Sequence, residues 1–339
     1  RLVAFRVAIN GYGRIGRCIL RAWIEAGANS DIEIVAINEL GDDSTIVHLT
    51  KYDSTHGRFP GAVSLDGGDL CVADKRIQLF HHAAIEQLPW GELDIDLVFE
   101  CTGRFSDRVT AEKHLAQGAK KVLFSQPADP DVDATVVYGI NHDELSATMR
   151  IVSNASCTTN ALLPVLHALD ERMNVLRGCI TTIHSAMNDQ PVIDAYHHTD
   201  LRKTRAASQS IIPVDTELAR GIVRIMPAFD GKFEAQAIRV PTTNVSLLDL
   251  ALDVGRDTSA AEVNTILQAA TANYCGVLGY TDEPLASCDF IHDDHSAIVD
   301  ASQTRVADGR LVKLIVWFDN EWGFANRMIQ TASHWLAAK

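Results

Sequence analysis

Cys157 is the residue best placed to form a covalent bond with a substrate. It follows the apolar pair Ile151 and Val152 and precedes a predicted helix over 161–169. A cysteine at such a strand-to-helix junction faces unpaired backbone N–H groups and the positive end of the helix dipole, so its thiolate is favoured over its thiol. We therefore expect Cys157 to be a nucleophile. The alternative is a small buried apolar side chain, as most free cysteines are.

His184 is the candidate acid–base partner of this cysteine. It ends a predicted inner strand over 178–184. A histidine at a strand end is often only a hydrogen-bonded structural residue. Beside a cysteine, however, an imidazole can pair with the thiolate and then accept a proton from an alcohol or from water. We expect Cys157 and His184 to act as a catalytic pair.

A glycine-rich turn near the N-terminus has the pattern that binds a dinucleotide. A predicted strand over 2–9 leads into this turn, and apolar residues with helical spacing follow it. Gly11 permits the tight turn, Gly13 lets the backbone approach a pyrophosphate, and Gly16 allows close helix–strand packing. Arg14 and Ile15 lie in the same turn, so we expect all five residues to bind the cofactor.

Glu39 predicts which dinucleotide is bound. It ends a second predicted strand, over 32–37, and follows the last glycine of the turn by about 20 residues. A carboxylate there accepts hydrogen bonds from a ribose 2′-hydroxyl and repels a 2′-phosphate, so NAD is favoured over NADP. The alternative is a solvated acid at a strand end.

The remaining pattern predicts an α/β protein of two domains. Strand-like runs at 95–100, 121–124 and 135–138 alternate with helices, which implies a Rossmann-type, doubly wound parallel sheet. Past Cys157, alternating apolar residues over 233–237 and 248–254 predict an α+β domain with a mostly antiparallel sheet. We expect an NAD-binding domain over 1–156, a catalytic domain over 157–320, and a C-terminal helix within 321–339 that returns to the first domain.

Composition limits the classes of partner. The chain has 339 residues and a net charge of −14, which argues against nucleic acid as a partner. Its seven cysteines are scattered and form no C-x-x-C pair, so we expect free thiols in a reducing compartment. No apolar run approaches membrane-spanning length, and we expect a cytoplasmic protein without membrane contacts.

Several words of the sequence resemble the glyceraldehyde-3-phosphate dehydrogenase family. They are S-N-A-S-C-T-T-N at 153–160, the segment around His184 at 181–190, and the closing segment at 311–324. The resemblance implies NAD-dependent oxidation of a phosphorylated aldehyde through a thioester on Cys157. It also implies that Thr102 and Ser125 lie near the nicotinamide ribose and that Asn320 binds the carboxamide.

The same resemblance implies a substrate site and an assembly. The substrate-binding residues that it implies are Ser156, Thr158, Lys203, Thr216, Glu217 and Arg239. Arg239 suits a phosphate monoester because its planar guanidinium can donate two parallel hydrogen bonds. The basic segment over 189–213 corresponds to one that lines the NAD pocket of a neighbouring subunit, which implies a homotetramer.

Three departures from the family pattern bear on function. Ala83 stands in the stretch where the family often has an arginine beside adenine. Met187 replaces a threonine that helps to bind phosphate, and Asp215 and Glu217 add carboxylates around an anion site. The words at 184–187, 194–197 and 212–216 resemble the branch of the family that oxidises erythrose 4-phosphate and releases the acid with water, which implies a step towards pyridoxal 5′-phosphate.

Two further activities remain open at this stage. One is the phosphorylating reaction of the glycolytic members, and the other is non-catalytic binding of NAD or RNA on the same fold. His292, His295 and the nearby Cys288 have the residue types of a transition-metal site. Similar polar turns occur in the family without metal, so we expect no metal here.

Overall fold

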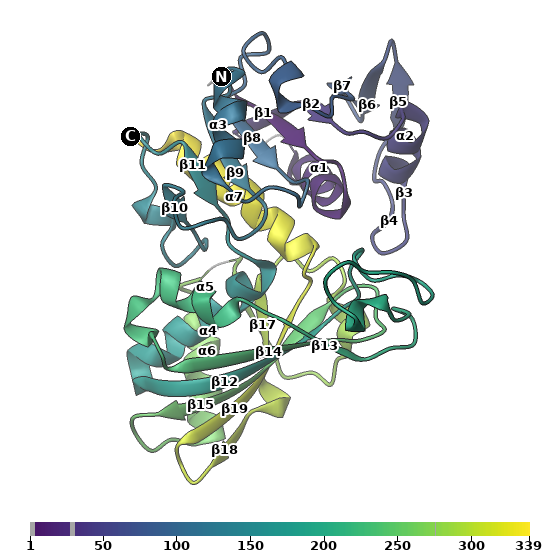
Figure 1. Ribbon diagram of the computed structural model, residues 1–339. Coiled ribbons are helices and arrows are strands. Elements are labelled where there is room, and N and C mark those ends of the chain that lie inside the picture. Colours follow the sequence, from purple (N-terminus) through teal and green to yellow (C-terminus); the bar gives the residue numbers. More distant parts are fainter. Residues whose placement is uncertain (1–3, 28–30, 275) are drawn as a thin grey trace. The chain divides into compact units, whose positions relative to one another are not determined.

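The computed structural model describes residues 4–27, 31–274 and 276–339. The predicted strand over 2–9 begins at Leu2 and Val3, which lie outside the described residues, as does Cys275. The chain forms two compact units (Figure 1). Unit 1 comprises residues 1–156 and 324–339, and unit 2 comprises Cys157–Gly323.

Unit 1 contains a nine-stranded sheet with the order β10-β11-β9-β8-β1-β2-β7-β6-β5. All neighbours from β10 to β7 pair in parallel, which confirms the predicted parallel sheet. The parallel strands are β1 (Phe5–Asn10), β2 (Ile32–Asn38), β7 (Lys75–Phe80), β8 (Leu97–Glu100), β9 (Lys121–Phe124), β10 (Ala134–Thr135) and β11 (Ile151–Ser153). The run over 135–138 is thus a much shorter strand than predicted.

An antiparallel edge completes this sheet. β5 (Val63–Asp66) pairs with β6 (Asp69–Val72), and β6 pairs with β7. Gly67 and Gly68 both have positive φ between β5 and β6, a backbone that glycine adopts readily in a tight hairpin. We did not predict this edge from the sequence.

The order in which successive strands join this sheet reverses at β1. β2 lies on one side of β1 and β8 on the other. Ligands of doubly wound sheets bind at such a switch point, outside the carboxyl ends of the strands. The helices of unit 1 are α1 (Arg14–Ala26), α2 (Asp43–Lys51), α3 (Arg108–Ala116) and α7 (Trp322–Ala337), and a small ribbon is formed by β3 (Tyr52–Asp53) and β4 (Gly57–Arg58).

The C-terminal helix is anchored in unit 1 by two side chains. The Thr331 hydroxyl donates to Asn154 Oδ1 over 2.8 Å, and Trp335 Nε1 donates to the Ser146 carbonyl over 3.1 Å. Both Thr331 and Trp335 are fully buried.

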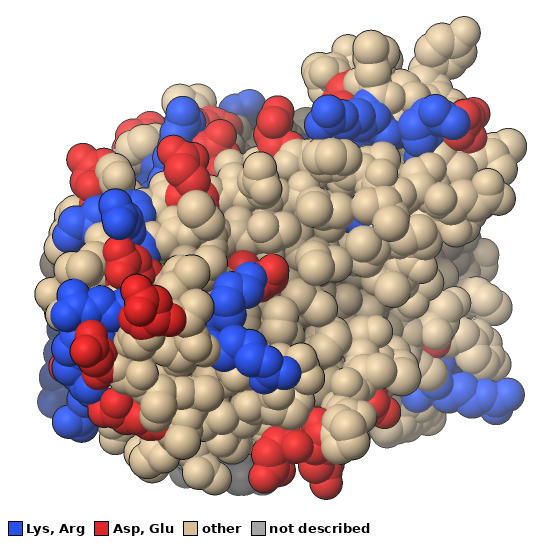
Figure 2. All heavy atoms as spheres, turned by 90° about the horizontal axis from the view of Figure 1, so that it is seen from below, with Lys and Arg blue, Asp and Glu red and all other residues tan. Residues whose placement is uncertain are grey.

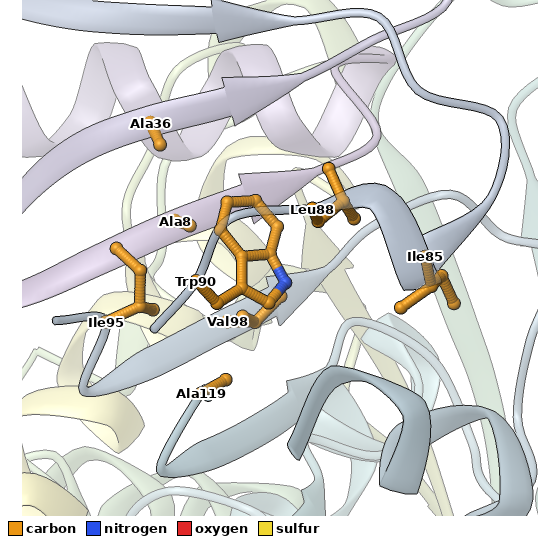
Figure 3. Packing of buried hydrophobic residues seen from close by; sticks show 8 residues of the cluster. All are labelled: Ala8, Ala36, Ile85, Leu88, Trp90, Ile95, Val98 and Ala119. Carbon is orange, nitrogen blue, oxygen red and sulfur yellow. The ribbon is translucent and has the colours of Figure 1, made fainter. Parts of the chain in front are cut away.

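Trp90 lies at the centre of one apolar cluster of unit 1 (Figure 3). Ala8 and Ala36 come from β1 and β2, and Val98 comes from β8. The small alanines leave room for the indole against the sheet. The other members are Ile85, Leu88, Ile95 and Ala119.

Unit 2 contains an eight-stranded sheet with the order β13-β14-β12-β15-β19-β17-β16, with β18 beside β19. Its strands are β12 (Val175–His184), β13 (Ile212–Val214), β14 (Phe233–Arg239), β15 (Ser246–Val254), β16 (Leu278–Thr281), β17 (Ala297–Asp300), β18 (Arg305–Ala307) and β19 (Leu311–Phe318). Only β12 with β14 and β16 with β17 pair in parallel. The prediction of a mostly antiparallel sheet is confirmed, and the inner strand that ends at His184 is β12.

Helices cover one face of the unit 2 sheet. α4 (Cys157–Met173) contacts β12, β15, β17 and β19, and α6 (Ala260–Ala270) packs beside α4. Side chains along β15 alternate between buried and partly exposed, as expected for a strand with one covered face. α5 (Leu218–Ile225) also contacts α4.

Acidic and basic side chains lie close together on the face shown in Figure 2, mostly towards its margin around a broad area with neither. The six cysteines that the structure describes are free thiols. None of the helices in the described ranges has the length and apolar character needed to cross a bilayer.

Candidate active site

Cys157 is held at the first residue of α4 by a strained turn. Ala155, two residues earlier, has φ of 56°, in the left-handed region that non-glycine residues rarely adopt. The helix after the turn is long and buried, with Leu162, Leu166 and Leu169 fully inaccessible. Burial of this apolar face fixes the helix, and the helix fixes the position of Sγ.

His184, at the end of β12, faces this sulfur. Its Nε2 lies 3.9 Å from Cys157 Sγ, and its Nδ1 lies 2.8 Å from the Ser185 carbonyl oxygen. A carbonyl can only accept, so Nδ1 carries the proton. Nε2 therefore presents a lone pair to Sγ and is available as a base.

Burial acts against the charge separation that we expected for this pair. Burial raises the pKa of the Cys157 thiol, and this effect outweighs the hydrogen bonds from Thr158 that lower it. Burial likewise lowers the pKa of His184. Both directions oppose an ion pair of thiolate and imidazolium, whereas the helix terminus favours the thiolate.

Asn320 has an orientation fixed by two serines. Its Oδ1 accepts a hydrogen bond from Ser185 Oγ over 3.1 Å and from Ser246 Oγ over 2.9 Å. The amide nitrogen is therefore the group left to donate to a ligand. A donor of this kind suits the carbonyl oxygen of a nicotinamide carboxamide.

Two predicted anion-binding cations converge on an acid that we did not predict. Arg239 donates to both carboxylate oxygens of Asp189, over 2.6 and 3.2 Å, and Lys203 Nζ lies 3.1 Å from the same group. Burial opposes ionisation of Asp189, but these two partners lower its pKa. Met187, 48% exposed, places Sδ 3.5 Å from Arg239 Nη2. A phosphate at this place would meet two cations, one carboxylate and a thioether.

Thr216 and Glu217 lie beyond β13, which pairs with β14 and so runs beside Arg239. The Thr216 hydroxyl oxygen accepts from the Leu218 N–H over 3.3 Å, so its proton stays available for a ligand. Glu217 is exposed and pairs with Arg220 over 2.8 Å. Asp215 is also exposed. The repulsion that we expected from these two carboxylates is therefore screened by solvent and, for Glu217, by Arg220.

The two residues that flank Cys157 both stay near the reactive sulfur. Thr158 places Oγ1 3.8 Å from Sγ, and Ser156 is partly buried at the start of α4. Both belong to the turn that positions the thiol.

The glycine-rich turn has room for a pyrophosphate. Gly11 has φ of +93°, and a Cβ there would lie 2.6 Å from the Thr102 backbone nitrogen. A Cβ at Gly16 would lie 2.3 Å from the Gly11 carbonyl oxygen, whereas one at Gly13 would meet nothing within 4 Å. The helix packs tightly on the turn while the backbone at Gly13 stays open, as the fingerprint requires.

Arg14 and Ile15 lie in the first turn of α1, where backbone N–H groups lack helical acceptors. The Arg14 side chain forms a two-point ion pair with Asp53, over 2.5 and 3.2 Å. Its guanidinium therefore connects α1 to the β3–β4 ribbon.

Glu39 joins the glycine-rich turn to the end of β2. Its carboxylate accepts from the backbone N–H groups of Tyr12 and Leu40, over 2.8 and 2.7 Å. It also lines a cavity of about 320 Å³ in unit 1. Asn10, Gly11, Gly13, Asn38, Leu40, His82, Ala83, Ile85, Cys101, Thr102, Arg104 and Phe105 complete this lining.

Two residues of the cavity lining bear on how it could bind NAD. Ala83 offers no hydrogen bond there, whereas Arg104, which we did not predict, supplies a cation. Thr102 and Ser125 follow β8 and β9, whose last residues Glu100 and Phe124 are register partners. These two hydroxyls are thus brought to neighbouring strand ends.

The expectation of no metal stays a prediction, because Asp293, Asp294 and His295 place their ligand atoms close enough together to hold a metal ion. His295 Nδ1 lies 2.8 Å from Asp293 Oδ1, and the His292 ring stacks on Trp322 with centroids 3.6 Å apart.

Asp189 and Arg104 are the site residues that the sequence analysis missed. Only the need of Arg239 and Lys203 for a counter-charge could have indicated Asp189.

Two family models match the sequence, one in each half. Residues 5–108 match the model described as glyceraldehyde 3-phosphate dehydrogenase, NAD binding domain. Residues 156–320 match the model described as glyceraldehyde 3-phosphate dehydrogenase, C-terminal domain. The first match contains the glycine-rich turn and the lining of the cavity, and the second contains Cys157, His184 and Asn320.

Proposed function

The chain belongs to the glyceraldehyde-3-phosphate dehydrogenase family, and from this premise we propose that it is an erythrose-4-phosphate dehydrogenase. The family makes it an NAD-dependent oxidoreductase that acts on a phosphorylated aldehyde, with NAD bound by the N-terminal domain. The choice among phosphorylated aldehydes is our proposal. The observation that carries it is Met187 against Arg239, where a hydroxyl would be expected in the glycolytic members.

The residues of unit 2 account for thioester formation. Cys157 Sγ adds to the aldehyde carbon as its proton leaves for His184 Nε2, 3.9 Å away. The imidazolium returns this proton to the alkoxide, which gives a hemithioacetal hydroxyl, and the neutral imidazole takes the proton back when the carbon is oxidised. NAD, when bound, supplies the hydride acceptor. The Ser185 carbonyl holds Nδ1–H, so the imidazole keeps the correct tautomer throughout.

The anion site supports a substrate whose phosphate is held by charge more than by hydroxyl groups. Arg239 is 6% exposed and already oriented by Asp189. Met187 covers this guanidinium with an apolar group that cannot donate a hydrogen bond.

Water is our proposed acyl acceptor, with His184 as its base and 4-phosphoerythronate as the product. The support is weaker than the sequence suggested, because Glu217 is paired with Arg220 and Thr216 keeps a free proton. The phosphorylating reaction of the glycolytic enzymes therefore remains the second candidate.

One assay distinguishes the two. NADH formation is followed with erythrose 4-phosphate and with glyceraldehyde 3-phosphate, first without inorganic phosphate and then with increasing amounts. We expect turnover of erythrose 4-phosphate without phosphate. The variant Met187→Thr restores the missing hydroxyl, and we expect it to shift the preference towards glyceraldehyde 3-phosphate. A reaction that requires phosphate and yields an acyl phosphate would establish the glycolytic activity instead.

We also propose that the protein is a cytoplasmic homotetramer without nucleic-acid or membrane partners. The segment over 190–211 supports the assembly, because it exposes large apolar side chains on a loop that has only the short helix Arg202–Thr204 (Figure 1). Those side chains are Val192, Ile193, Tyr196, Leu201 and Ile211. Exposed apolar groups of this density mark an interaction surface.

A further inference from the structure

A buried carboxylate lies at the carboxyl end of β8, next to the cavity of unit 1. Glu100 is 1% exposed and accepts four hydrogen bonds. Asn10 Nδ2 and His114 Nε2 donate to Oε2 over 2.7 and 2.9 Å, and the Thr102 backbone N–H and hydroxyl donate to Oε1 over 3.0 and 2.5 Å. Four donors and no acceptor among these contacts are what an ionised carboxylate requires.

The histidine beside Glu100 is neutral. Trp90 Nε1, which can only donate, lies 2.9 Å from His114 Nδ1. Nδ1 therefore has no proton, and the single ring proton lies on Nε2, directed at Glu100. His114 is fully buried, and Trp90 is fixed by the apolar cluster of Figure 3. Glu100 thus accepts a hydrogen bond from a rigid, neutral imidazole and does not form an ion pair with His114.

A series of hydrogen bonds that ends at Glu100 continues along the neighbouring strand ends. Asn38 Nδ2 donates to Asn10 Oδ1 over 2.8 Å, and the His82 N–H donates to Asn38 Oδ1 over 2.9 Å. Asn10 therefore directs an N–H group at Glu100, and Asn38 directs one N–H group at Asn10 and the other at the His82 carbonyl, over 3.0 Å. Hydrogen bonds aligned in one direction strengthen each other, and the charge at the end of the chain sets that direction.

The consequence for the cofactor site lies in the Thr102 hydroxyl. Its only proton is directed at Glu100, and its oxygen accepts from the Arg104 N–H over 3.2 Å. Thr102 lines the cavity, so the group it offers there is an oxygen that can accept and cannot donate. Such a group binds a hydroxyl donor, and the hydroxyls of NAD are on its riboses.

We propose that Glu100 is a positioning residue of the NAD site, which acts by fixing the Thr102 hydroxyl as a hydrogen-bond acceptor. This inference rests on NAD binding by unit 1 and not on the identity of the aldehyde. In Glu100→Gln, the amide would direct N–H groups at some of the four donors. The Thr102 hydroxyl would then rotate, and its proton would no longer be donated to a carboxylate.

The test is a double-mutant cycle on NAD affinity, measured by calorimetry with the full protein and no aldehyde. Glu100→Gln is expected to raise the NAD dissociation constant about 10- to 100-fold, the loss for a hydrogen-bond network to a charged group. Thr102→Val is expected to have a similar effect, and Thr102→Ser to bind as the wild type does. In the Thr102→Val background, Glu100→Gln should add little.

Asp96→Asn is the matched control. Asp96 lies just before the opposite end of β8 and accepts from the Arg6 N–H over 2.8 Å. Its loss should leave NAD affinity unchanged. In steady state, Glu100→Gln should raise KM for NAD and leave KM for the aldehyde unaltered.

Two results would overturn the proposal. One is equal loss of affinity from Glu100→Gln with and without the Thr102 hydroxyl. The other is wild-type affinity in Thr102→Val, which remains informative if Glu100→Gln fails to fold. Neither result depends on which aldehyde the enzyme oxidises.

Discussion

At the scale of single residues, we predict that Cys157 and His184 react by proton transfer from a neutral thiol to a neutral imidazole. The Ser185 carbonyl fixes Nδ1–H of His184, so Nε2 can remove the thiol proton as the substrate arrives. Burial raises the pKa of Cys157 and lowers the pKa of His184, and both directions oppose a resting ion pair.

This resting state predicts how alkylation of Cys157 depends on pH. Below the pKa of a thiol, each pH unit raises its thiolate fraction tenfold. Because the pKa of Cys157 is raised, we expect the alkylation rate to rise roughly 100-fold from pH 6.5 to 8.5. Iodoacetamide labelling followed by mass spectrometry of the Cys157 peptide separates this thiol from the other cysteines. A rate that stays constant across this range would show a thiolate paired with imidazolium.

His184→Asn gives the complementary measurement. Loss of the base should lower turnover by about 10² to 10⁴, the range for a positioned acid–base group. The pH profile of alkylation should stay as in the wild type, because the resting imidazole carries no charge. His167→Asn changes a histidine elsewhere on α4 and should alter neither quantity.

The prediction that Cys157 and His184 lie close together is confirmed. It was possible because both segments resemble the family and because one residue precedes a predicted helix while the other ends a predicted strand. The sequence could not indicate the protonation of the pair, since burial depends on packing from distant elements. It also missed Asp189, whose role follows only from the approach of Arg239, 50 residues away. Local pattern contains no information on such contacts.

At the scale of elements, the ion pair between Arg14 and Asp53 connects the start of α1 to the β3–β4 ribbon. Asp53 also accepts from the backbone N–H groups of Thr55 and His56, over 2.8 and 2.9 Å. Burial opposes ionisation of Asp53, but Arg14 and these N–H groups hold its pKa well below the usual range. An acid with a lowered pKa stabilises the fold above its unfolded pKa of about 3.9, and this stabilisation declines as the pH falls below that value.

We therefore expect Asp53→Asn to lower the free energy of unfolding by about 2 kcal/mol at pH 7. Urea unfolding at pH 7 and pH 5 should show the same loss, and the gap to wild type should narrow only below about pH 4. Asp66→Asn removes the more exposed of the two carboxylates that pair with Arg76, Asp69 being the other, and should cost about 0.5 kcal/mol or less. Equal losses in the two variants would show that the Arg14–Asp53 pair contributes no more to the free energy of unfolding than an exposed ion pair does.

Most elements near the site were predictable from periodicity. β9 was predicted with its observed bounds, and α1, β2 and β12 were predicted within a few residues. The antiparallel edge of β5 and β6 was missed, although Gly67 and Gly68 between two short runs are a hairpin signal. The run over 135–138 was predicted too long because apolar residues there are buried without a strand partner along their whole length.

At the scale of the whole chain, chemistry and cofactor binding are divided between two units. Cys157, His184 and Asn320 belong to unit 2, which begins directly after Ser156. The cavity lined by Glu39 belongs to unit 1, as does Glu100 beside it. α7 belongs to unit 1 although the chain passes through unit 2 to reach it. Truncation before α7 would therefore remove a buried part of the NAD-binding unit and not of the catalytic one.

The proposed tetramer is tested on the loop over 190–211. Ile193 is 76% exposed and Tyr196 fully exposed, so neither contributes to the packing of a single chain. If subunits associate through this loop, the double variant Ile193→Ser, Tyr196→Ser should dissociate without unfolding, because only apolar area between subunits is lost. Sedimentation velocity should show a shift from tetramer to smaller species, with an unchanged circular dichroism spectrum. Val109→Ser, at a similarly exposed site on α3, should leave the assembly intact. A tetramer that resists the double variant, or a wild-type monomer, would show that this loop does not hold subunits together.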